Sequence, residues 1–344
     1  MSACRIVHDA DLAGRTTFGV AVRAPLLVEV ADADALPGLF DDALRGMPVL
    51  VLGGGSNLLF AGPPEGAVLA LAGRRQSIVE ARGDRVRVRA EAGADWDAFV
   101  RWTLAGGLAG LENLALIPGT VGAAPIQNIG AYGTEVREAI VLVDAFEPAT
   151  GAFHRFTNDA CGFAYRDSRF KREAGRYVVT AVEFELSRGA APRVGYAGVR
   201  EELDAMGAGE APTAVQVADA VTAIRRRKLP DPARIGNAGS FFKNPVVPAG
   251  VARALRDQHP GMPAWPMDDD ATKLSAAWLI DQCGWKGHRD GDAGVAATHA
   301  LVLVNHGAAS GAQLLDLARR IAESVHARFG VALEPEPRII GAHW

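Results

Sequence analysis

Cysteine is scarce in this sequence of 344 residues, and its three copies, Cys4, Cys161 and Cys283, lie far apart with no C-x-x-C pair. This argues against a disulfide scaffold and against a cysteine-rich zinc site. The eight histidines show no H-E-x-x-H or comparable ligand spacing, so we expect no catalytic metal.

Long apolar runs are also missing, since none approaches the ~18 residues of a membrane-spanning helix. The N-terminus lacks the apolar region of a signal peptide. We therefore expect a cytoplasmic protein with no membrane partner. The net charge of −4 gives no reason to expect nucleic acid as a partner. With 49% hydrophobic residues, the chain should form a sizeable core, divided among two or three domains.

The first half of the chain reads as strands and turns with occasional helices. Leu26–Val30 and Val49–Leu52 are short apolar runs typical of buried strands. Arg85–Glu91 alternates strictly and Val178–Leu186 alternates as well, which predicts strands with one buried face. Ala94–Leu104 has the apolar spacing of a helix.

The second half begins after a segment rich in Gly, Ala and Pro, residues 188–212, which we interpret as a linker or an inserted loop. Capping boxes predict helix starts at Thr213 and Ser310. The further elements that we expect are helices at Thr213–Lys228, Lys273–Gln282 and Ser310–Phe329, and strands at Ala300–Val304 and Arg338–Gly341. The pattern indicates a β-rich α+β half followed by a smaller α/β unit, without the strict βαβαβ order of a doubly wound fold.

The most unusual segment is Pro118–Gly133, which lies within a longer stretch, Asn113–Thr134, that has no charged residue. Its four glycines allow close backbone approach and positive φ. Thr120, Gln127, Asn128 and Tyr132 add neutral hydrogen-bonding groups. Such a segment suits a large, partly apolar ligand held by backbone groups, for example a flavin.

A second glycine turn follows the strand at Val49–Leu52 and covers Gly53–Asn57. It matches neither the Walker A pattern nor G-x-G-x-x-G. Its backbone N–H groups could form an anion nest for a diphosphate, or the segment could be a simple turn between strands. Together with Pro118–Gly133, it suggests one extended nucleotide cofactor.

Two charged segments have a structural and a functional interpretation. Tyr165–Lys171 could be a solvated turn, or Arg166 could bind a carboxylate or polarise an enolate. The cations at Arg225–Lys228 complement a helix dipole, or Arg225 and Lys228 could grip phosphates from one helix face. Spacing alone does not separate these alternatives.

Two further segments carry candidate proton donors. Ser240 lies between glycine and two phenylalanines; it could occupy a turn or cap a helix, but a hydroxyl in an apolar pocket can also deliver a proton. No G-x-S-x-G elbow is present, so we do not expect a hydrolase nucleophile. Near the C-terminus, we expect Glu334 at the surface and take Glu336 as the better catalytic candidate.

The sequence motifs described above, and the order in which they occur, resemble those of the bacterial UDP-N-acetylenolpyruvoylglucosamine reductases (UDP-N-acetylmuramate dehydrogenases). The resemblance spans residues 15 to 341 and includes Tyr196 in the segment 188–212, which is similar to the longer class with an inserted tyrosine loop. The matching segments are Thr17–Gly19, Gly53–Leu59, Ile117–Gly133, Tyr165–Lys171, Lys228–Pro230, Gly236–Pro245 and Glu336–Gly341.

This resemblance implies an FAD-binding PCMH-type (vanillyl-alcohol-oxidase-like) α+β unit of two subdomains at residues 1–187. The inserted loop follows at 188–212, then a smaller α/β substrate-binding domain at 213–331. A C-terminal strand at 332–344 carries the catalytic glutamate.

It also implies non-covalent FAD, NADPH as reductant and UDP-N-acetylglucosamine enolpyruvate as substrate, in a protein that we expect to be a monomer. Ser240 would protonate the substrate, and Arg166 and Glu336 would stabilise or protonate the enolate-like intermediate. The residues that we expect to contact the substrate are Tyr165, Tyr196, Arg225, Lys228 and Asn244. The residues assigned to FAD are Gly53, Gly54, Gly55, Ser56, Asn57, Pro118, Gly119, Thr120, Gly122, Ala123, Gln127, Asn128, Ile129, Gly130, Ala131, Tyr132 and Gly133.

Two alternatives stay open. One is another flavin oxidase or dehydrogenase of the vanillyl-alcohol-oxidase type, acting on a small hydroxylated substrate. Many such enzymes attach FAD through a histidine, and neither glycine loop contains one. The other is a nucleotide-binding or scaffolding protein without catalysis.

Overall fold

The computed structural model describes residues 3–267 and 270–344. Its contacts divide the chain into two compact units, each built from segments that are distant in sequence. Unit 1 contains the residues up to Ala10, Ala24–Gly54 and Glu65–Arg226, and unit 2 contains Asp11–Arg23, Gly55–Pro64 and Arg227–Trp344.

Unit 1 contains a four-stranded sheet in the order β1-β2-β5-β3. Its strands are β1 (Cys4–Asp11), β2 (Arg23–Val30), β5 (Ala67–Leu71) and β3 (Val49–Val51). β2 and β3 both run parallel to β5, and Val28, Val30 and Leu69 are buried beside the short helix α1 (Leu36–Asp41). Parallel strands covered in this way need continuous apolar runs, which explains the composition of Leu26–Val30.

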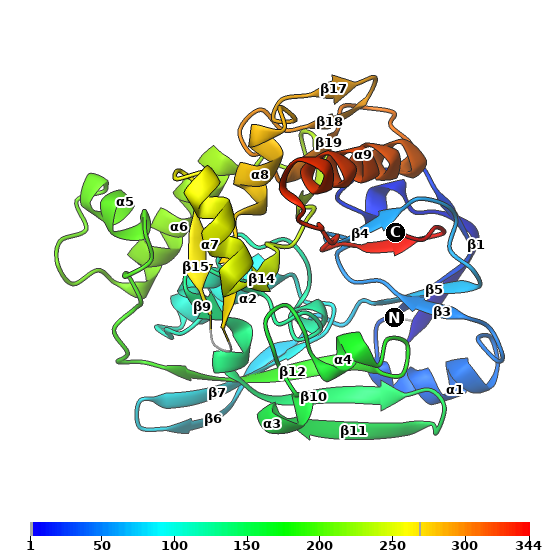
Figure 1. The fold of residues 1–344 in the computed structure, drawn as a ribbon. Coiled ribbons are helices and arrows are strands. Elements are labelled where there is room, and N and C mark those ends of the chain that lie inside the picture. Colours follow the sequence, from blue (N-terminus) through cyan, green and yellow to red (C-terminus); the bar gives the residue numbers. More distant parts are fainter. Residues whose placement is uncertain (1–2, 268–269) are drawn as a thin grey trace. The chain divides into compact units, whose positions relative to one another are not determined.

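A second sheet of unit 1 is antiparallel and has the order β11-β10-β12-β7-β6 (Figure 1). Its strands are β11 (Ala152–Thr157), β10 (Ile140–Glu147), β12 (Val178–Ser187), β7 (Arg85–Glu91) and β6 (Gln76–Arg82). In β7, Val86, Val88 and Ala90 are fully buried while the arginines between them are not, so the predicted alternation is confirmed.

Helix α2 (Trp96–Ala105) packs in the core of unit 1. Asp95 caps it by accepting from the Ala98 N–H, and the helix ends at Gly106. The rings of Trp96 and Phe99 lie 6.0 Å and 5.1 Å from that of Phe184 in β12. The helix expected at Ala94–Leu104 is therefore confirmed with its start shifted by two residues.

A network of charges crosses four strands of the antiparallel sheet, β11, β10, β12 and β7. Asp144 in β10 accepts hydrogen bonds from Arg89 and, at 2.9 Å, from Arg155, while both arginines also pair with Glu183. Burial raises the pKa of Asp144, but the two arginines outweigh it and hold that pKa below its ordinary value.

This network predicts a pH-dependent contribution to stability. At pH 7, Asp144→Asn should lower the free energy of unfolding by about 1–2 kcal/mol, because it removes the charge that both arginines contact. A carboxyl with a lowered folded-state pKa stabilises the fold above its unfolded pKa near ~3.9 and loses this effect as the pH falls through the folded value. Urea titrations from pH 7 to 3 should show the difference shrinking. The exposed pair of Asp219 provides a control, since Asp219→Asn should cost less than about 0.5 kcal/mol. A constant Asp144→Asn deficit across the range would contradict the prediction.

The segment 188–212 is more ordered than the predicted loop, because it contains α5 (Val199–Ala205). Val199 and Leu203, spaced by one helical turn, are fully buried in the unit 1 core. α6 (Ala214–Lys228) follows, and Thr213 and Gln216 form the expected capping box. The remaining helices of unit 1 are the short α3 (Asn158–Cys161) and α4 (Arg169–Arg172).

Unit 2 has a four-stranded antiparallel sheet in the order β13-β19-β18-β17. The strands are β13 (Gly236–Ser240), β19 (Val302–Asn305), β18 (Ala293–Val295) and β17 (Arg289–Asp290). A three-stranded sheet has the order β14-β16-β15, with β14 (Val246–Pro248), β16 (Ala271–Leu274) and β15 (Ala264–Pro266). The C-terminal β20 (Arg338–Ile340) pairs in parallel with β4 (Leu58–Phe60).

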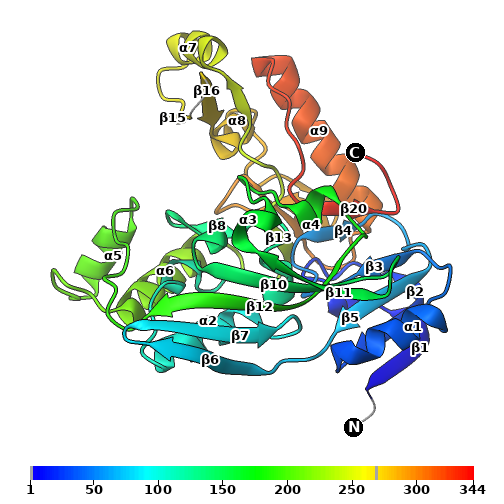
Figure 2. The same cartoon turned by 90° about the horizontal axis from the view of Figure 1, so that it is seen from below.

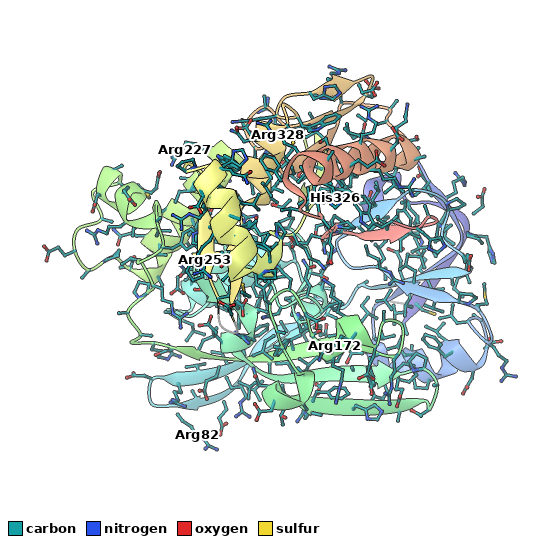
Figure 3. All side chains as sticks on the ribbon, viewed as in Figure 1. Arg82, Arg172, Arg227, Arg253, His326 and Arg328 are labelled. Atoms are coloured by element: carbon teal, nitrogen blue, oxygen red, sulfur yellow. The ribbon has the colours of Figure 1, made fainter. Side chains whose placement is uncertain are left out.

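The helices of unit 2 are α7 (Ala249–Gln258), α8 (Ala276–Gln282) and α9 (Gly311–Phe329), seen from a second direction in Figure 2. α9 begins at the predicted capping box and ends at Gly330 with φ 66°. His326 and Arg328, labelled in Figure 3, lie in its last turn, where positive charge complements the helix dipole. The helix expected at Lys273–Gln282 starts too early, because Lys273 belongs to β16 and Ser275 caps α8.

No helix within residues 3–267 or 270–344 is long and apolar enough to cross a membrane.

Candidate active site

The two glycine loops of the sequence lie against each other in unit 1. A Cβ added to Gly54 would lie 2.8 Å from the Gly119 Cα, and one added to Gly53 would lie 2.8 Å from the Thr120 Oγ1. Side chains at these positions would therefore force the loops apart. This contact is compatible with the prediction that both loops serve one cofactor, which stays a prediction.

Backbone donors in this contact are available to a ligand. The N–H groups of Gly53, Gly54, Gly119 and Thr120 donate no hydrogen bond within the described part of the chain. By contrast, the N–H groups of Val121 and Gly122 donate to Ala94 and Ala92 and tie the loop to its scaffold. Gly53 and Gly54 are exposed and Gly119 and Thr120 are half-buried, so these four donors are open to an acceptor-rich ligand.

The C-terminal part of the long loop forms a tight hairpin of β8 (Gly130–Ala131) and β9 (Thr134–Glu135). Asn128 holds its base: the fully buried amide donates to Glu135 and to the Ala164 carbonyl, and its oxygen accepts from the Arg137 N–H. These bonds use both amide protons. In a cofactor site, Asn128 would therefore stabilise the conformation of the loop.

Backbone strain gathers at this hairpin. Asn128, Tyr132 and Arg166 have φ values of 47°, 48° and 54°, and Leu116 nearby in the loop has φ 57°. Such values are uncommon outside glycine and cost of order 1–3 kcal/mol each. They persist only where the surroundings impose them, which is a frequent property of ligand-binding sites.

Arg166 reaches this hairpin from the segment Tyr165–Lys171. Its guanidinium donates to the Gly130 carbonyl at 2.7 Å and lies over the Tyr165 ring, 5.3 Å from the centroid. The Lys171 ammonium donates to the Arg166 carbonyl at 2.9 Å. The arginine is therefore held at the glycine loop with its side chain half-buried.

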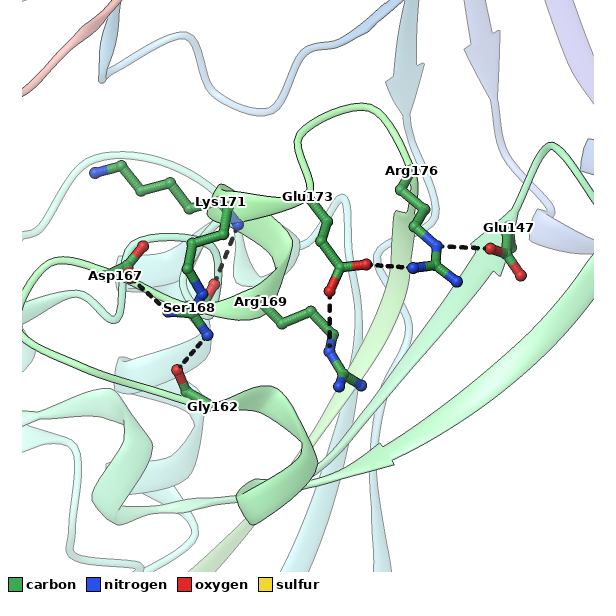
Figure 4. Close-up of polar contacts among 9 residues, drawn as sticks. Glu147, Gly162, Asp167, Ser168, Arg169, Lys171, Glu173 and Arg176 are labelled. Atoms are coloured by element: carbon green, nitrogen blue, oxygen red, sulfur yellow. Dashed lines mark hydrogen bonds and ion pairs between the residues drawn. The ribbon is translucent and has the colours of Figure 1, made fainter.

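Most other charges of this segment are paired within unit 1 (Figure 4). Asp167 pairs with Arg172, and Arg169 pairs with Glu173. Arg176 then joins Glu173 to the buried carboxylate of Glu147. The structural interpretation thus accounts for Asp167 and Arg169, whereas Arg166 turns toward the loop, as does Ser168, whose hydroxyl donates to the Ile126 carbonyl.

Arg225 approaches the same loop from α6. Its Nε donates to the Leu116 carbonyl at 3.2 Å. Burial lowers the pKa of Arg225, while Tyr132 and Asp97 act in the opposite direction. Arg225 is therefore a partly buried cation beside the glycine loop. Complementing the helix dipole from the surface does not account for this position.

Tyr196 of the inserted segment also meets this loop. Its ring lies edge-on to that of Tyr132, with centroids 5.4 Å apart. The Tyr196 side chain is still half exposed.

In unit 2, Ser240 and Glu336 lie on neighbouring backbone segments. Phe242 is paired opposite Pro335, and the Glu336 N–H donates to the Phe241 carbonyl at 2.8 Å. Phe241 and Phe242 are fully buried, which fixes the end of β13, and the Ser240 hydroxyl makes no hydrogen bond within the described part of the chain. Asn57 joins this group because its amide donates to the Glu336 carbonyl at 3.4 Å.

Glu334 takes a different position, since its carboxylate is exposed and pairs with Lys243 at 2.9 Å. The expectation of a surface position for Glu334 is confirmed. Asn244 has a structural bond, because its Oδ1 accepts from the Ala276 N–H at the start of α8. Lys228 lies near His299, whose pKa is lowered by burial and then by the charges of Lys228 and Lys286.

Two family models match this chain. The FAD binding domain model matches residues 24–157, and the model of the UDP-N-acetylenolpyruvoylglucosamine reductase C-terminal domain matches residues 231–340. A UDP-N-acetylenolpyruvoylglucosamine reductase from Xanthomonas euvesicatoria is 55% identical over 99% of this chain and 97% of its own length. The chain belongs to the UDP-N-acetylenolpyruvoylglucosamine reductase family.

Other members of this family agree over the same length. The reductase of Xylella fastidiosa strain M12 is 54% identical over 98% of this chain and 97% of its own. A crystal structure of UDP-N-acetylenolpyruvylglucosamine reductase from Thermus caldophilus is 27% identical, with a TM-score of 0.68 and 98% of both chains covered. The predicted α+β fold, an FAD-binding PCMH-type unit followed by a smaller domain, is confirmed.

The residues present fit the FAD of this family. The paired loops offer unused backbone donors, and the segment Asn113–Thr134 carries no charge. The buried hydroxyl of Thr134 has no hydrogen-bond partner in the described residues, so one more polar group in the β8–β9 hairpin is left for a ligand. Within those residues, no three His, Cys, Asp or Glu side chains gather as metal ligands.

Sequence reasoning gave no role to Asn113 or Arg193. Asn113 is almost completely buried and donates to the carbonyls of Tyr132 and Arg193. The only sequence signal was that Asn113 opens the uncharged segment. Its second partner lies 80 residues away, and no local pattern predicts such a contact.

Proposed function

We propose that this protein reduces UDP-N-acetylglucosamine enolpyruvate to UDP-N-acetylmuramate with NADPH and FAD, a step of peptidoglycan precursor synthesis. The observation that carries the proposal is the 55% identity to a UDP-N-acetylenolpyruvoylglucosamine reductase over nearly the whole chain. The cytoplasmic location and the monomeric state stay predictions.

The paired loops of unit 1 would hold FAD. Gly53, Gly54, Gly119 and Thr120 would donate backbone hydrogen bonds to the cofactor. When bound, FAD takes up a hydride from NADPH and supplies it to the vinyl carbon of the enolpyruvyl group. Neither loop contains a histidine, so we propose non-covalent binding.

Ser240 would supply the proton that the reduction also requires. The half-buried hydroxyl follows a glycine with φ 68° and precedes two buried rings, so its position is well defined. It would give its proton to the carbon next to the one that accepts hydride and regain a proton from solvent. General acids held in this way contribute about 10²–10⁴-fold.

Arg166 and Glu336 would act on the charge that develops on the enolpyruvyl carboxylate. The guanidinium of Arg166 can donate to that carboxylate and stabilise an enolate-like intermediate. Glu336 would assist the proton transfer from the segment that precedes β20 and pairs with Phe242. Tyr165, Tyr196, Arg225, Lys228 and Asn244 are proposed to contact the sugar nucleotide.

The second candidate function is oxidation of a small hydroxylated substrate by a related flavoprotein. One observation tests it directly, because covalent flavin is common in that class. Denatured protein should release yellow flavin, and colour that stays on the chain would count against our proposal. A protein that gains no absorbance near ~450 nm with FAD would instead be a scaffold.

Anaerobic stopped-flow absorbance tests the function itself. NADPH should bleach the bound flavin in a first mixing step, and UDP-N-acetylglucosamine enolpyruvate should restore its absorbance in a second. UDP-N-acetylglucosamine, which lacks the vinyl group, is the matched control and should restore nothing. Bleached flavin that stays reduced with the enolpyruvyl sugar would refute the proposal.

A further inference from the structure

We propose that Asn113 and Arg193 form a clamp that docks the inserted segment on the glycine loop and so positions Tyr196 before substrate binds. This inference rests on the proposed function only for its effect on substrate affinity. The clamp consists of the Asn113 amide, the Arg193 backbone and side chain, and the Tyr132–Gly133 turn, all within unit 1.

The centre of the clamp is a single side-chain amide with two bonds. The Asn113 Nδ2 donates to the Tyr132 carbonyl at 3.1 Å and to the Arg193 carbonyl at 3.0 Å. Asn113 is only 2% exposed, so both bonds are shielded from water. One amide group thus joins the glycine loop to the inserted segment, and both carbonyls would lose a partner without it.

Arg193 adds a second, peripheral contact. Its guanidinium donates to the Gly133 carbonyl at 3.4 Å and pairs with Glu138. These groups are largely exposed, so we expect them to contribute less than the buried amide.

The base of the clamp is rigid. Asn113 lies in a short 3₁₀ turn, Glu112–Leu114, and the buried indole of Trp96 donates to the Leu114 carbonyl at 2.9 Å. Trp96 belongs to the aromatic core around Phe99 and Phe184. The position of Asn113 is therefore determined by the core of unit 1.

The other end of the segment is anchored too. Val199 and Leu203 of α5 are fully buried, and the Val199 N–H donates to the Tyr196 carbonyl at 3.0 Å. Between Arg193 and Val199, the chain has two glycines, Gly195 and Gly198, and would be flexible if either anchor were lost.

Docking at both ends places Tyr196 on the loop. Its ring meets that of Tyr132 at 76°, and a Cβ added at Gly133 would lie 3.6 Å from the Tyr196 Cδ2. A segment that is already ordered spares a ligand the entropic cost of ordering it. The clamp should therefore act on substrate binding, as a set of positioning residues that do not touch the reacting atoms.

Hydrogen exchange measures the docking without any substrate. In the FAD-loaded protein, Asn113→Ala should raise the exchange rate of the Val199 amide, which donates to the Tyr196 carbonyl at 3.0 Å, by about tenfold or more, since this amide would exchange through local opening. Asn158→Ala is the matched control, because Asn158 also donates to two backbone carbonyls, those of Arg137 and Ile140, at 2.7 Å and 2.8 Å. The control should leave the exchange rate of the Val199 amide unchanged.

Kinetics measure the consequence. Asn113→Ala should raise the KM for UDP-N-acetylglucosamine enolpyruvate by about tenfold and change kcat less than about twofold, the split expected when ordering is lost and the reacting groups remain. Arg193→Ala changes an exposed side chain, so the variant should fold normally. It should raise both the exchange rate and the KM by about threefold.

The outcomes separate the two proposals. Exchange of the Val199 amide that is equal in Asn113→Ala and Asn158→Ala would overturn the clamp, as would a fall in kcat with KM unchanged. If Asn113→Ala does not fold, Arg193→Ala decides by the same two measurements. Wild-type flavin that the enolpyruvyl sugar does not reoxidise would overturn the proposed function, while hydrogen exchange would still decide on the clamp.

Discussion

Ser240→Ala should slow the reoxidation of the flavin by UDP-N-acetylglucosamine enolpyruvate about 10²–10⁴-fold and leave its reduction by NADPH within about twofold. The substitution removes one hydroxyl whose oxygen has no protein partner in the described residues. Reduction by NADPH requires no proton from this residue, so only the second half-reaction should respond. Anaerobic stopped-flow measures both rates separately.

Controls for this experiment come from the same chain. Ser77→Ala removes an exposed hydroxyl from β6 and should affect neither half-reaction. Glu336→Gln should also spare the first half-reaction and slow the second. Glu334→Gln should change neither half-reaction, since Glu334 pairs with Lys243 at the surface. Equal slowing of both half-reactions in Ser240→Ala would remove Ser240 from the role of acid.

Gly54→Ala should weaken FAD binding by about 100-fold or more. The added methyl would lie 2.8 Å from the Gly119 Cα and 3.2 Å from its carbonyl carbon, and backbone atoms cannot rotate away. The two loops would have to separate, and the unused N–H groups on both would no longer face one ligand. Titration of the apoprotein with FAD, followed by flavin fluorescence, measures the dissociation constant.

Gly38→Ala is the matched control, because a Cβ at Gly38 meets nothing within 4 Å and its helix α1 accepts alanine. It should bind FAD with the affinity of the wild type. Thermal unfolding of both apoproteins would separate lost binding from lost folding. Unchanged FAD affinity in Gly54→Ala would place the cofactor away from the contact of the two loops.

Local structure was predictable where it depends on neighbours in sequence. The alternation of Arg85–Glu91 gave β7 with its buried face, and the capping box at Ser310 gave the start of α9. The predicted elements were wrong where a short pattern was compatible with both a helix and a strand. The sequence around Lys273 is compatible with a helix, but pairing with β14 and β15 makes it the strand β16.

The inserted segment shows the same limit. Its glycines and prolines predicted a loop, yet Val199 and Leu203 find a place in the core of unit 1 and stabilise α5. These two side chains belong to a cluster of buried residues that extends from Val86 to Ile224, and no window of the sequence contains all of it.

For the site, the sequence determined which residue types are available and predicted that two uncharged glycine loops bind one ligand. It also supplied the order of motifs by which the family could be recognised. These properties depend on composition and on spacing within a few residues, which determine hydrogen-bonding capacity and backbone freedom.

Only the tertiary structure decided which of these residues meet. Asn57 and Glu336 are 279 positions apart and share a hydrogen bond, and the Asn113 amide joins Tyr132 to Arg193. Such contacts arise from the pairing of β4 with β20 and from the packing of the core beneath Asn113. Which residues form such contacts depends on how the whole chain packs. The contact of the glycine loop Pro118–Gly133 with the clamp could therefore be identified only from the folded structure.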